Sequence, residues 1–252
     1  MRVLYKIRVE KPAASAGGRK DVENSMDTEK KTIAVAIDGP SGAGKSTIAK
    51  ILAKELRFIY VDTGALYRSI GYTALRRGVA PDDAEAVEAL LPSLHPELRY
   101  IDGAQRVLVN GEDVSDHIRT PEVSLAASKV SSLPAVRRAL FDLQRDMAKK
   151  NNVIMDGRDI GTVVLPDAEV KIFLTASAEV RAQRRYEELR EKGTDVTYDE
   201  VLADMKKRDY DDSHRAVAPL KAAEDAVRVD TTAYSLEQAV AALKELVEKA
   251  LG

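Results

Sequence analysis

The sequence predicts an α/β fold built around a central parallel sheet. Short apolar runs alternate along the chain with stretches whose apolar residues recur at helical spacing. The first apolar run, residues 33–37, leads through a glycine-rich turn directly into such a helical stretch. The order then repeats from residue 58, and a repeated sequence of strand, helix and strand is typical of a parallel sheet covered by helices.

The expected elements follow this rhythm from residue 32 to the end of the chain. Apolar runs place the strands at 33–37, 58–61, 152–155, 170–174 and 226–229. Helical spacing places the covering helices at 48–56, 66–75, 178–192, 198–212 and 235–251. Between about 79 and 150 the pattern changes to a helix at 84–91, strands at 98–101 and 107–109, and helices at about 122–131 and 134–150. We interpret this region, about 79–150, as an insertion.

Composition excludes several classes of function. The 252 residues include 39 basic and 41 acidic side chains, so the formal charge of −2 gives no general attraction to nucleic acid or to an anionic membrane. Cysteine is absent, which excludes disulfides, thiolate metal sites and cysteine nucleophiles. The apolar runs are far shorter than the roughly 20 residues of a membrane span. We therefore expect a cytoplasmic monomer with no nucleic-acid or membrane partner.

The first 31 residues differ from the rest of the chain. An apolar and basic stretch is followed by a segment rich in alanine and glycine and then by a charged segment. No apolar core of a secretory signal is present. We expect 1–31 to be a flexible leader and 32–252 to be a single domain; Met26 leaves open that the residues before it are a start-site artefact.

The glycine-rich turn carries a phosphate-binding pattern. Residues 39–46 match G-x-x-x-x-G-K-[ST], and they stand after a strand and at the start of a helix, where the pattern is specific. Glycines allow successive backbone N–H groups to converge on phosphate oxygens, a lysine neutralises the β and γ phosphates, and a hydroxyl can ligate Mg²⁺. The candidates are Gly39, Pro40, Ser41, Gly42, Ala43, Gly44, Lys45, Ser46 and Thr47. The alternative is a plain turn with a solvated lysine.

Further charged residues follow the later strands. Asp156 ends a strand, where a sheet delivers side chains to the crevice beyond its carboxyl ends; the alternative is a carboxylate that caps a turn. Arginine suits phosphate through its planar fork of donors, although a single arginine is more often a solvated surface group. The candidates are Arg68, Arg137, Arg158, Arg208 and Arg215. Arg181, Arg184 and Arg185 share one helix face that could close over phosphates, or could pair with nearby glutamates at the surface.

Taken together, these motifs resemble bacterial cytidylate kinases over nearly all of 33–251. The segments that carry the resemblance are IDGPSGAGKST (37–47), DTGALYR (62–68), GEDVSDHIRT (111–120), DGRDIGTVV (156–164) and RAVAPL (215–220). The resemblance implies a three-layer P-loop kinase fold with a nucleotide-monophosphate-binding insertion and a helical lid at about 177–215. It implies transfer of the γ-phosphoryl group of ATP to CMP or dCMP with Mg²⁺.

The same resemblance implies roles for individual residues. It places the catalytic groups at Lys45, Asp156, Arg158, Arg181 and Arg215, and further ATP contacts at Arg184 and Arg185; the expectation of Mg²⁺ at Ser46 comes instead from the general phosphate-binding pattern. It places CMP-binding groups at Thr63, Arg68, Ser128, Arg137, Arg158, Asp159, Arg208, Asp212 and Arg215. Within that set, Ser128, Arg137 and Asp159 are implied to read the cytosine edge. Ser46 stands where the family often has glycine, and Thr63 where serine is common; both keep a hydroxyl.

Three other functions remain open from the residues alone. A kinase for another nucleoside monophosphate or a small alcohol would use the same loop, although the segment around Arg158 and Asp159 favours CMP. A P-loop GTPase should carry an Asn/Thr-Lys-x-Asp motif, and none follows Asp156. A nucleotide-binding module without catalysis is hard to reconcile with Lys45, Ser46 and Asp156 together.

Overall fold

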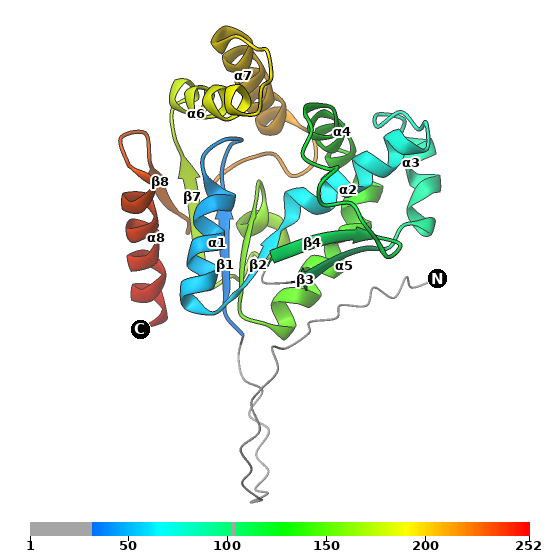
Figure 1. The fold of residues 1–252 in the computed structure, drawn as a ribbon. Helices are drawn as coiled ribbons and strands as arrows, with labels where there is room; N and C mark the ends of the chain where they lie inside the picture. The colour runs from blue at the N-terminus through cyan, green and yellow to red at the C-terminus, as the bar shows by residue number, and fades with distance from the viewer. Residues whose placement is uncertain (1–31, 102–103) are drawn as a thin grey trace, which may run out of the picture.

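The computed structural model describes residues 32–101 and 104–252 (Figure 1). The leader expected at 1–31 lies outside the described residues. The main sheet contains five strands, β1 (Ala34–Asp38), β2 (Ile59–Asp62), β6 (Val153–Gly157), β7 (Val170–Thr175) and β8 (Val227–Asp230). Their order is β2-β6-β1-β7-β8, and every neighbouring pair is parallel. The parallel sheet predicted from the sequence is therefore confirmed.

Helices cover both faces of this sheet. On one face lie α1 (Lys45–Leu56) and α8 (Leu236–Leu251); on the other lie α2 (Thr63–Arg76) and α5 (Pro134–Lys150). The short apolar run of β1 is continuous because Val35 and Ile37 pack toward α1 and α8, whereas Ala34 and Ala36 pack toward α2 and α5. The result is the three-layer α/β architecture that the sequence and its resemblance to P-loop kinases predicted.

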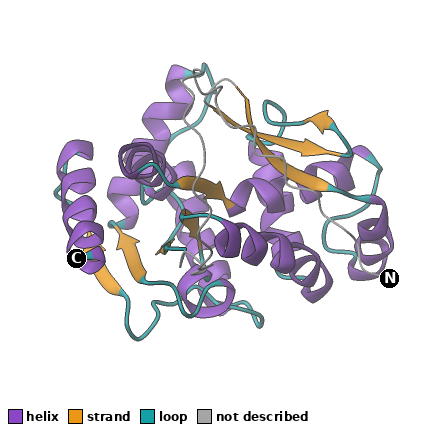
Figure 2. Ribbon diagram, turned by 90° about the horizontal axis from the view of Figure 1, so that it is seen from below, coloured by secondary structure: helices purple, strands orange, loops and turns teal. Residues whose placement is uncertain are grey.

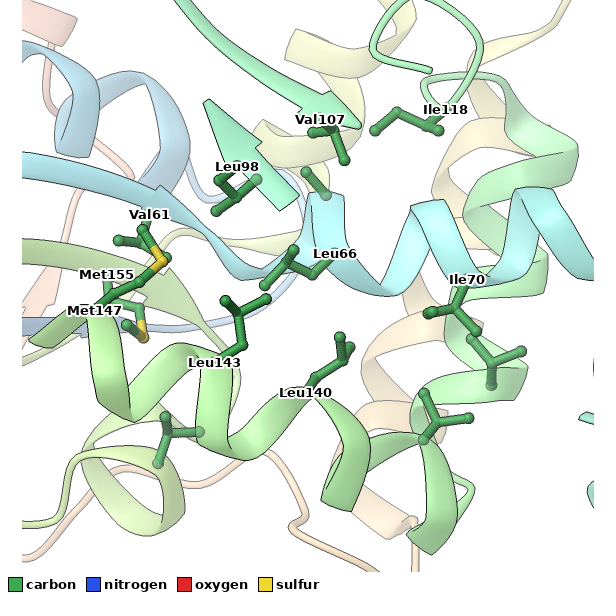
Figure 3. Close-up of a cluster of buried hydrophobic side chains, with 14 of the residues drawn as sticks. Val61, Leu66, Ile70, Leu98, Val107, Ile118, Leu140, Leu143, Met147 and Met155 are labelled. Atoms are coloured by element: carbon green, nitrogen blue, oxygen red, sulfur yellow. The ribbon is translucent and has the colours of Figure 1, made fainter. Parts of the chain in front are cut away.

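The second face holds the larger core. Leu66 and Ile70 of α2 pack with Leu140 and Leu143 of α5 and with Val61 of β2 (Figure 3). Side chains of the antiparallel strands described next complete this cluster. Because α5 lies directly against the main sheet, the residues between α2 and β6 are joined to the same hydrophobic core as the sheet itself.

The region between α2 and α5 contains a small antiparallel sheet, beside the main sheet in Figure 2. Its strands are β3 (Pro96–Ile101), β4 (Ala104–Val109) and β5 (Glu112–Asp113), and its helical segments are α3 (Ala84–Leu90), η1 (Leu91–Ser93) and α4 (Pro121–Ser131). The short strand β5 was not predicted, because two exposed acidic residues carry no apolar signal. The limits of the insertion stay a prediction.

Two helices lie beyond the carboxyl ends of the parallel strands, at the top of Figure 1. They are α6 (Ala178–Glu191) and α7 (Tyr198–His214). Both begin at capped residues: the Ser177 side chain accepts from the Val180 N–H, and Thr197 forms a reciprocal capping box with Glu200. None of the described helices is long and apolar enough to cross a membrane.

A π-helical turn, η2 (Ile160–Val164), follows β6 and was not predicted. Asp38 at the end of β1 fixes it: one carboxylate oxygen accepts from the Ile160 N–H at 2.8 Å and the other from the Gly161 N–H at 2.7 Å. This contact joins residues 122 positions apart, so local periodicity gives no sign of it.

Candidate active site

A cleft of about 510 Å³ opens between the ends of the parallel strands and the helices α6 and α7. It is lined by the phosphate-loop residues from Ser41 onward, the start of α2, parts of α4 and α5, the residues after β6, and α6 and α7. All of the predicted site residues line this cleft except Gly39 and Pro40, which lie at the base of the loop. The fold thus brings together groups that are spread over some 170 residues of sequence.

The phosphate loop has the geometry that its glycines predict. Gly39 has a φ of +151°, and a Cβ added there would lie 1.9 Å from the Leu174 carbonyl oxygen of β7. Gly44, with a φ of +86°, is the N-cap of α1. The loop therefore turns sharply against the sheet and presents the positive end of a helix to the cleft.

Lys45 is buried at the floor of the cleft. Its Nζ donates to the Pro40 carbonyl at 2.7 Å, and 4 % of the residue is exposed. Burial, together with the nearby Arg158 guanidinium, lowers the pKa of Lys45 to about 7, while Asp156 and Asp212 oppose this shift. An anion that enters the cleft beside Lys45 would therefore favour the protonated, charged form of its side chain.

Asp156 at the end of β6 accepts hydrogen bonds from two hydroxyls. Ser46 Oγ donates to Asp156 Oδ2 at 2.7 Å, and Tyr60 OH donates to Asp156 Oδ1 at 2.9 Å. Thr63 Oγ1 donates to the Asp156 carbonyl at 2.7 Å. Burial, followed by the charge of Asp62, raises the pKa of Asp156. Ser46 and Asp156 are adjacent oxygen donors of the type that Mg²⁺ prefers.

A second carboxylate organises the start of α2. Asp62 Oδ1 accepts from the Ala65 N–H at 2.8 Å and so caps the helix. Its other oxygen accepts from Arg68 Nη2 at 3.3 Å and from Arg119 Nη2 at 3.1 Å. Although burial raises it, the pKa of Asp62 is lowered overall by these two arginines. Arg119 comes from the segment 111–120, and the sequence analysis gave neither it nor Asp62 a role.

Two more carboxylates hold three further arginines of the cleft. Asp159 forms buried ion pairs with Arg137 and, at 3.2 Å, with Arg215. Asp212 of α7 accepts from Arg158 Nε at 2.7 Å. Each of these carboxylates therefore orients guanidinium groups toward the same cavity.

The other candidates differ in their surroundings. Arg208 lies 3.9 Å from Asp204, and burial lowers its pKa. Ser128 lies on α4 and lines the cleft, and its backbone carbonyl accepts from Ser131 Oγ at 2.9 Å.

The three arginines of α6 have different environments. Arg181 is buried: it donates to the Ser41 carbonyl of the phosphate loop at 2.9 Å and pairs with Asp209 of α7. Arg184 donates to the Thr231 carbonyl at 3.3 Å, and Arg185 pairs with Glu188 on its own helix. Arg181 thus joins the loop to both helices, whereas Arg185 has the glutamate partner expected of a surface helix.

Comparison with known proteins identifies the family of the chain. The family model described as cytidylate kinase matches residues 35–249. The chain belongs to the cytidylate kinase family. Membership of this family makes it a nucleoside monophosphate kinase, which transfers a phosphoryl group from ATP to CMP or dCMP.

Curated relatives agree along most of the sequence. The cytidylate kinase of Caldicellulosiruptor bescii is 50 % identical over 219 residues, which are 87 % of this chain and 97 % of the relative. That of Carboxydothermus hydrogenoformans is 51 % identical over 213 residues, 84 % of this chain and 96 % of the relative. A solved structure of a shikimate kinase from Bacteroides thetaiotaomicron is 14 % identical, covering 86 % of this chain and 98 % of that one, with a TM-score of 0.43.

Proposed function

We propose that this cleft binds both substrates of the cytidylate kinase reaction, with ATP along the loop 39–47 and CMP against α2, α4 and α7. The main support is that the buried Lys45 lines the same cavity as the arginines that Asp62, Asp159 and Asp212 hold. A phosphoryl group in transfer carries charge over several oxygens, so a ring of oriented cations is the arrangement that stabilises it.

On the ATP side, the backbone N–H groups of the loop and the Lys45 ammonium would bind the phosphates. Arg181 already contacts the loop through the Ser41 carbonyl, and Arg184 and Arg185 line the same side of the cleft. We propose that Arg181 stabilises the transferred group and that Arg184 and Arg185 contact ATP from the lid, 177–215.

The cleft also offers a place for Mg²⁺. The Ser46 hydroxyl and the Asp156 carboxylate lie within hydrogen-bond distance of each other at the foot of the loop. The described residues contain no cluster of three or more acidic or histidine side chains that could hold a metal, which suits an ion that keeps waters and takes phosphate oxygens as ligands. When bound, Mg²⁺ would neutralise charge on the phosphates of ATP.

On the acceptor side, we propose that Asp159, Arg137 and Ser128 read the cytosine edge and that Arg68, Arg158 and Arg215 bind the CMP phosphate. Thr63, Arg208 and Asp212 would complete the CMP site around the phosphate and ribose. In the described structure Arg68, Arg158 and Arg215 are paired with Asp62, Asp212 and Asp159. An entering phosphate would therefore meet guanidinium groups whose orientation is already fixed.

The chemical step needs little acid or base catalysis. Phosphoryl transfer has a loose, in-line transition state, so positioning and charge neutralisation contribute most of the rate. Closure of the lid and of the insertion, about 79–150, would exclude water that otherwise hydrolyses ATP.

A coupled assay of ADP release with ATP and Mg²⁺ tests this proposal, with CMP, dCMP, UMP, AMP or GMP as acceptor. We expect rapid release only with CMP and dCMP. In Asp159→Asn we expect kcat/KM for CMP to fall about 10- to 100-fold, because a charge-assisted hydrogen bond is lost, and the gap between CMP and UMP to narrow.

Unchanged discrimination in Asp159→Asn would contradict the proposed reading of cytosine. Asp225→Asn is the matched control, since the exposed Asp225 pairs with Lys171 and neither residue lines the cleft. That variant should keep the wild-type rates with every acceptor.

A further inference from the structure

Gln105 is a polar residue on the apolar face of an antiparallel hairpin. Side chains two positions apart on a strand point to the same side, so Gln105 shares a face of β4 with Val107 and Val109. Both valines are buried in the hydrophobic cluster that contains Leu66, and Figure 3 labels Val107 and Leu66 in it. An amide in this position is unfavourable unless both of its ends form hydrogen bonds.

Both ends of the amide bond the backbone of β2. Gln105 Nε2 donates to the Tyr60 carbonyl at 2.6 Å, and Gln105 Oε1 accepts from the Asp62 N–H at 3.2 Å. These two backbone groups flank Val61, and a single residue of a neighbouring parallel strand would bond the same pair. Because β2 is the edge strand of the main sheet, the Gln105 side chain completes its free edge as another strand would.

Of the two residues that Gln105 holds, Asp62 lines the cleft, and Tyr60 contacts a residue that lines it. Tyr60 donates its hydroxyl to Asp156, the carboxylate beside Ser46. Asp62 accepts from Arg68 and Arg119. One amide on the hairpin therefore fixes the strand that carries Asp62 and that also supplies Tyr60, the partner of Asp156.

We propose that Gln105 is a positioning residue for phosphoryl transfer: by closing the edge of β2 it holds Asp62 and Tyr60, and through them Arg68 and Asp156, in the geometry that the reaction needs. The inference rests on the proposed assignment of Arg68 to the acceptor phosphate. Gln105 itself touches no reacting atom in this scheme, and it connects the hairpin of β3 and β4 to the active site.

The first test is Gln105→Met, which keeps the length of the side chain and removes both hydrogen bonds to β2 together with the one that Nε2 donates to the Tyr100 hydroxyl. We expect kcat/KM for CMP to fall about 10-fold, the scale of one or two lost hydrogen bonds at a partly buried site. Tyr100→Phe is the matched control: the Tyr100 hydroxyl also donates to the Tyr60 carbonyl, but Asp62 keeps its bond to Gln105. That variant should stay within about 2-fold of wild type.

The second test is Gln105→Glu, because a protonated glutamic acid reproduces both hydrogen bonds and an ionised one cannot donate to the Tyr60 carbonyl. Relative to wild type, its kcat/KM for CMP should be about 10-fold low at about pH 7.5, where the carboxyl is ionised, and should recover as the pH falls toward about 4.5 and the carboxyl takes up a proton. In Gln105→Met the ratio to wild type should not change with pH. The charged and titratable groups around position 105 are Lys50, Tyr60, Asp62, Tyr100, Arg106, Asp116 and Arg119.

The outcomes separate this inference from the function on which it rests. A Gln105→Met enzyme within about 2-fold of wild type, a Gln105→Glu ratio that is flat with pH, or an equal loss in Tyr100→Phe would each overturn the positioning role. An unchanged kcat/KM for CMP in Arg68→Lys would instead contradict the assignment of Arg68 to the acceptor phosphate. Thermal melting of each variant shows that the chain remains folded.

Discussion

At the scale of single residues, the charge of Lys45 depends on what the cleft contains. Burial and the neighbouring Arg158 lower the pKa of Lys45 to about 7, so near pH 8 most molecules of the free enzyme carry a neutral lysine. Phosphates bound beside Lys45 add negative charge and stabilise its ammonium form. Binding of ATP should therefore be coupled to uptake of a proton.

Isothermal titration calorimetry of ATP at pH 8 in buffers of different ionisation enthalpy measures this uptake. We expect a net uptake of protons, at most about one for each ATP bound, because the pKa of Lys45 moves back toward its ordinary value. Lys45→Met should bind ATP more weakly and show heats that do not depend on the buffer. Buffer-independent heats for the wild-type chain would contradict the lowered pKa.

At the scale of elements, the packing of α4 on α2 places Ser128. Gly71 stands on the face of α2 that meets α4, and a Cβ added there would lie 2.9 Å from Ala127 N and 3.0 Å from Ala126 C. These are backbone atoms, so the added methyl group cannot be accommodated by turning a side chain. The absence of a side chain at Gly71 thus lets α4 approach closely enough to line the cleft with Ser128.

Gly71→Ala tests this contact, because close packing and helix propensity predict changes of opposite sign in the free energy of unfolding. Helix propensity alone predicts that alanine stabilises α2 by about 1 kcal/mol. We expect instead that the variant loses about 1–3 kcal/mol of unfolding free energy, because α4 must move away, and that its KM for CMP rises while its KM for ATP stays near wild type. Chemical denaturation and steady-state kinetics measure these quantities.

Gly78→Ala is the control for Gly71→Ala. Gly78 follows α2 with a φ of +69°, and a Cβ there would meet no atom within 4 Å. This change should cost about 1 kcal/mol through the backbone alone and leave the KM for CMP unchanged. A Gly71→Ala enzyme that is more stable than wild type, with an unaltered KM, would show that α4 does not need the glycine.

At the scale of the whole molecule, Asp38 links the central strand to the turn after β6 and makes stability depend on pH. Burial raises the pKa of Asp38 to about 6, although the Gly161 and Ile160 N–H groups oppose the shift. Between about pH 4 and pH 6 the folded chain thus keeps a proton that the unfolded chain releases. Since the folded state binds more protons than the unfolded state in this window, the contribution of Asp38 to the free energy of unfolding falls as the pH rises.

Asp38→Asn isolates this contribution, because asparagine does not titrate. The unfolding free energy of wild type minus that of the variant should decrease by about 2 kcal/mol between about pH 4.5 and pH 7. Urea titrations at several pH values measure the difference, and any pH-independent loss of a hydrogen bond appears as a constant offset. A difference that is constant with pH would mean that the carboxyl is ionised throughout.

The sequence alone determined the layered fold and the phosphate loop. Both depend on contiguous residues: an apolar run defines a strand, helical spacing defines a covering helix, and the backbone of 39–46 forms its own binding surface. The helices at 134–150 and 198–212 were also found from periodicity, within two residues of the observed α5 and α7. The sequence also provided the candidate arginines, the resemblance to cytidylate kinases added their individual roles, and the cleft brings these arginines together.

Only the tertiary structure decided which arginine pairs with which aspartate in the cleft. Arg119 reaches Asp62 across 57 positions, Arg215 reaches Asp159 across 56, and Arg158 reaches Asp212 across 54. Periodicity reports which face of an element is buried, but it does not report which partner a polar group meets on another element. For the same physical reason the contacts of the buried Asp38 and the half-buried Gln105 could not be predicted: such polar side chains are stabilised by hydrogen bonds to distant backbone, and those depend on the complete fold.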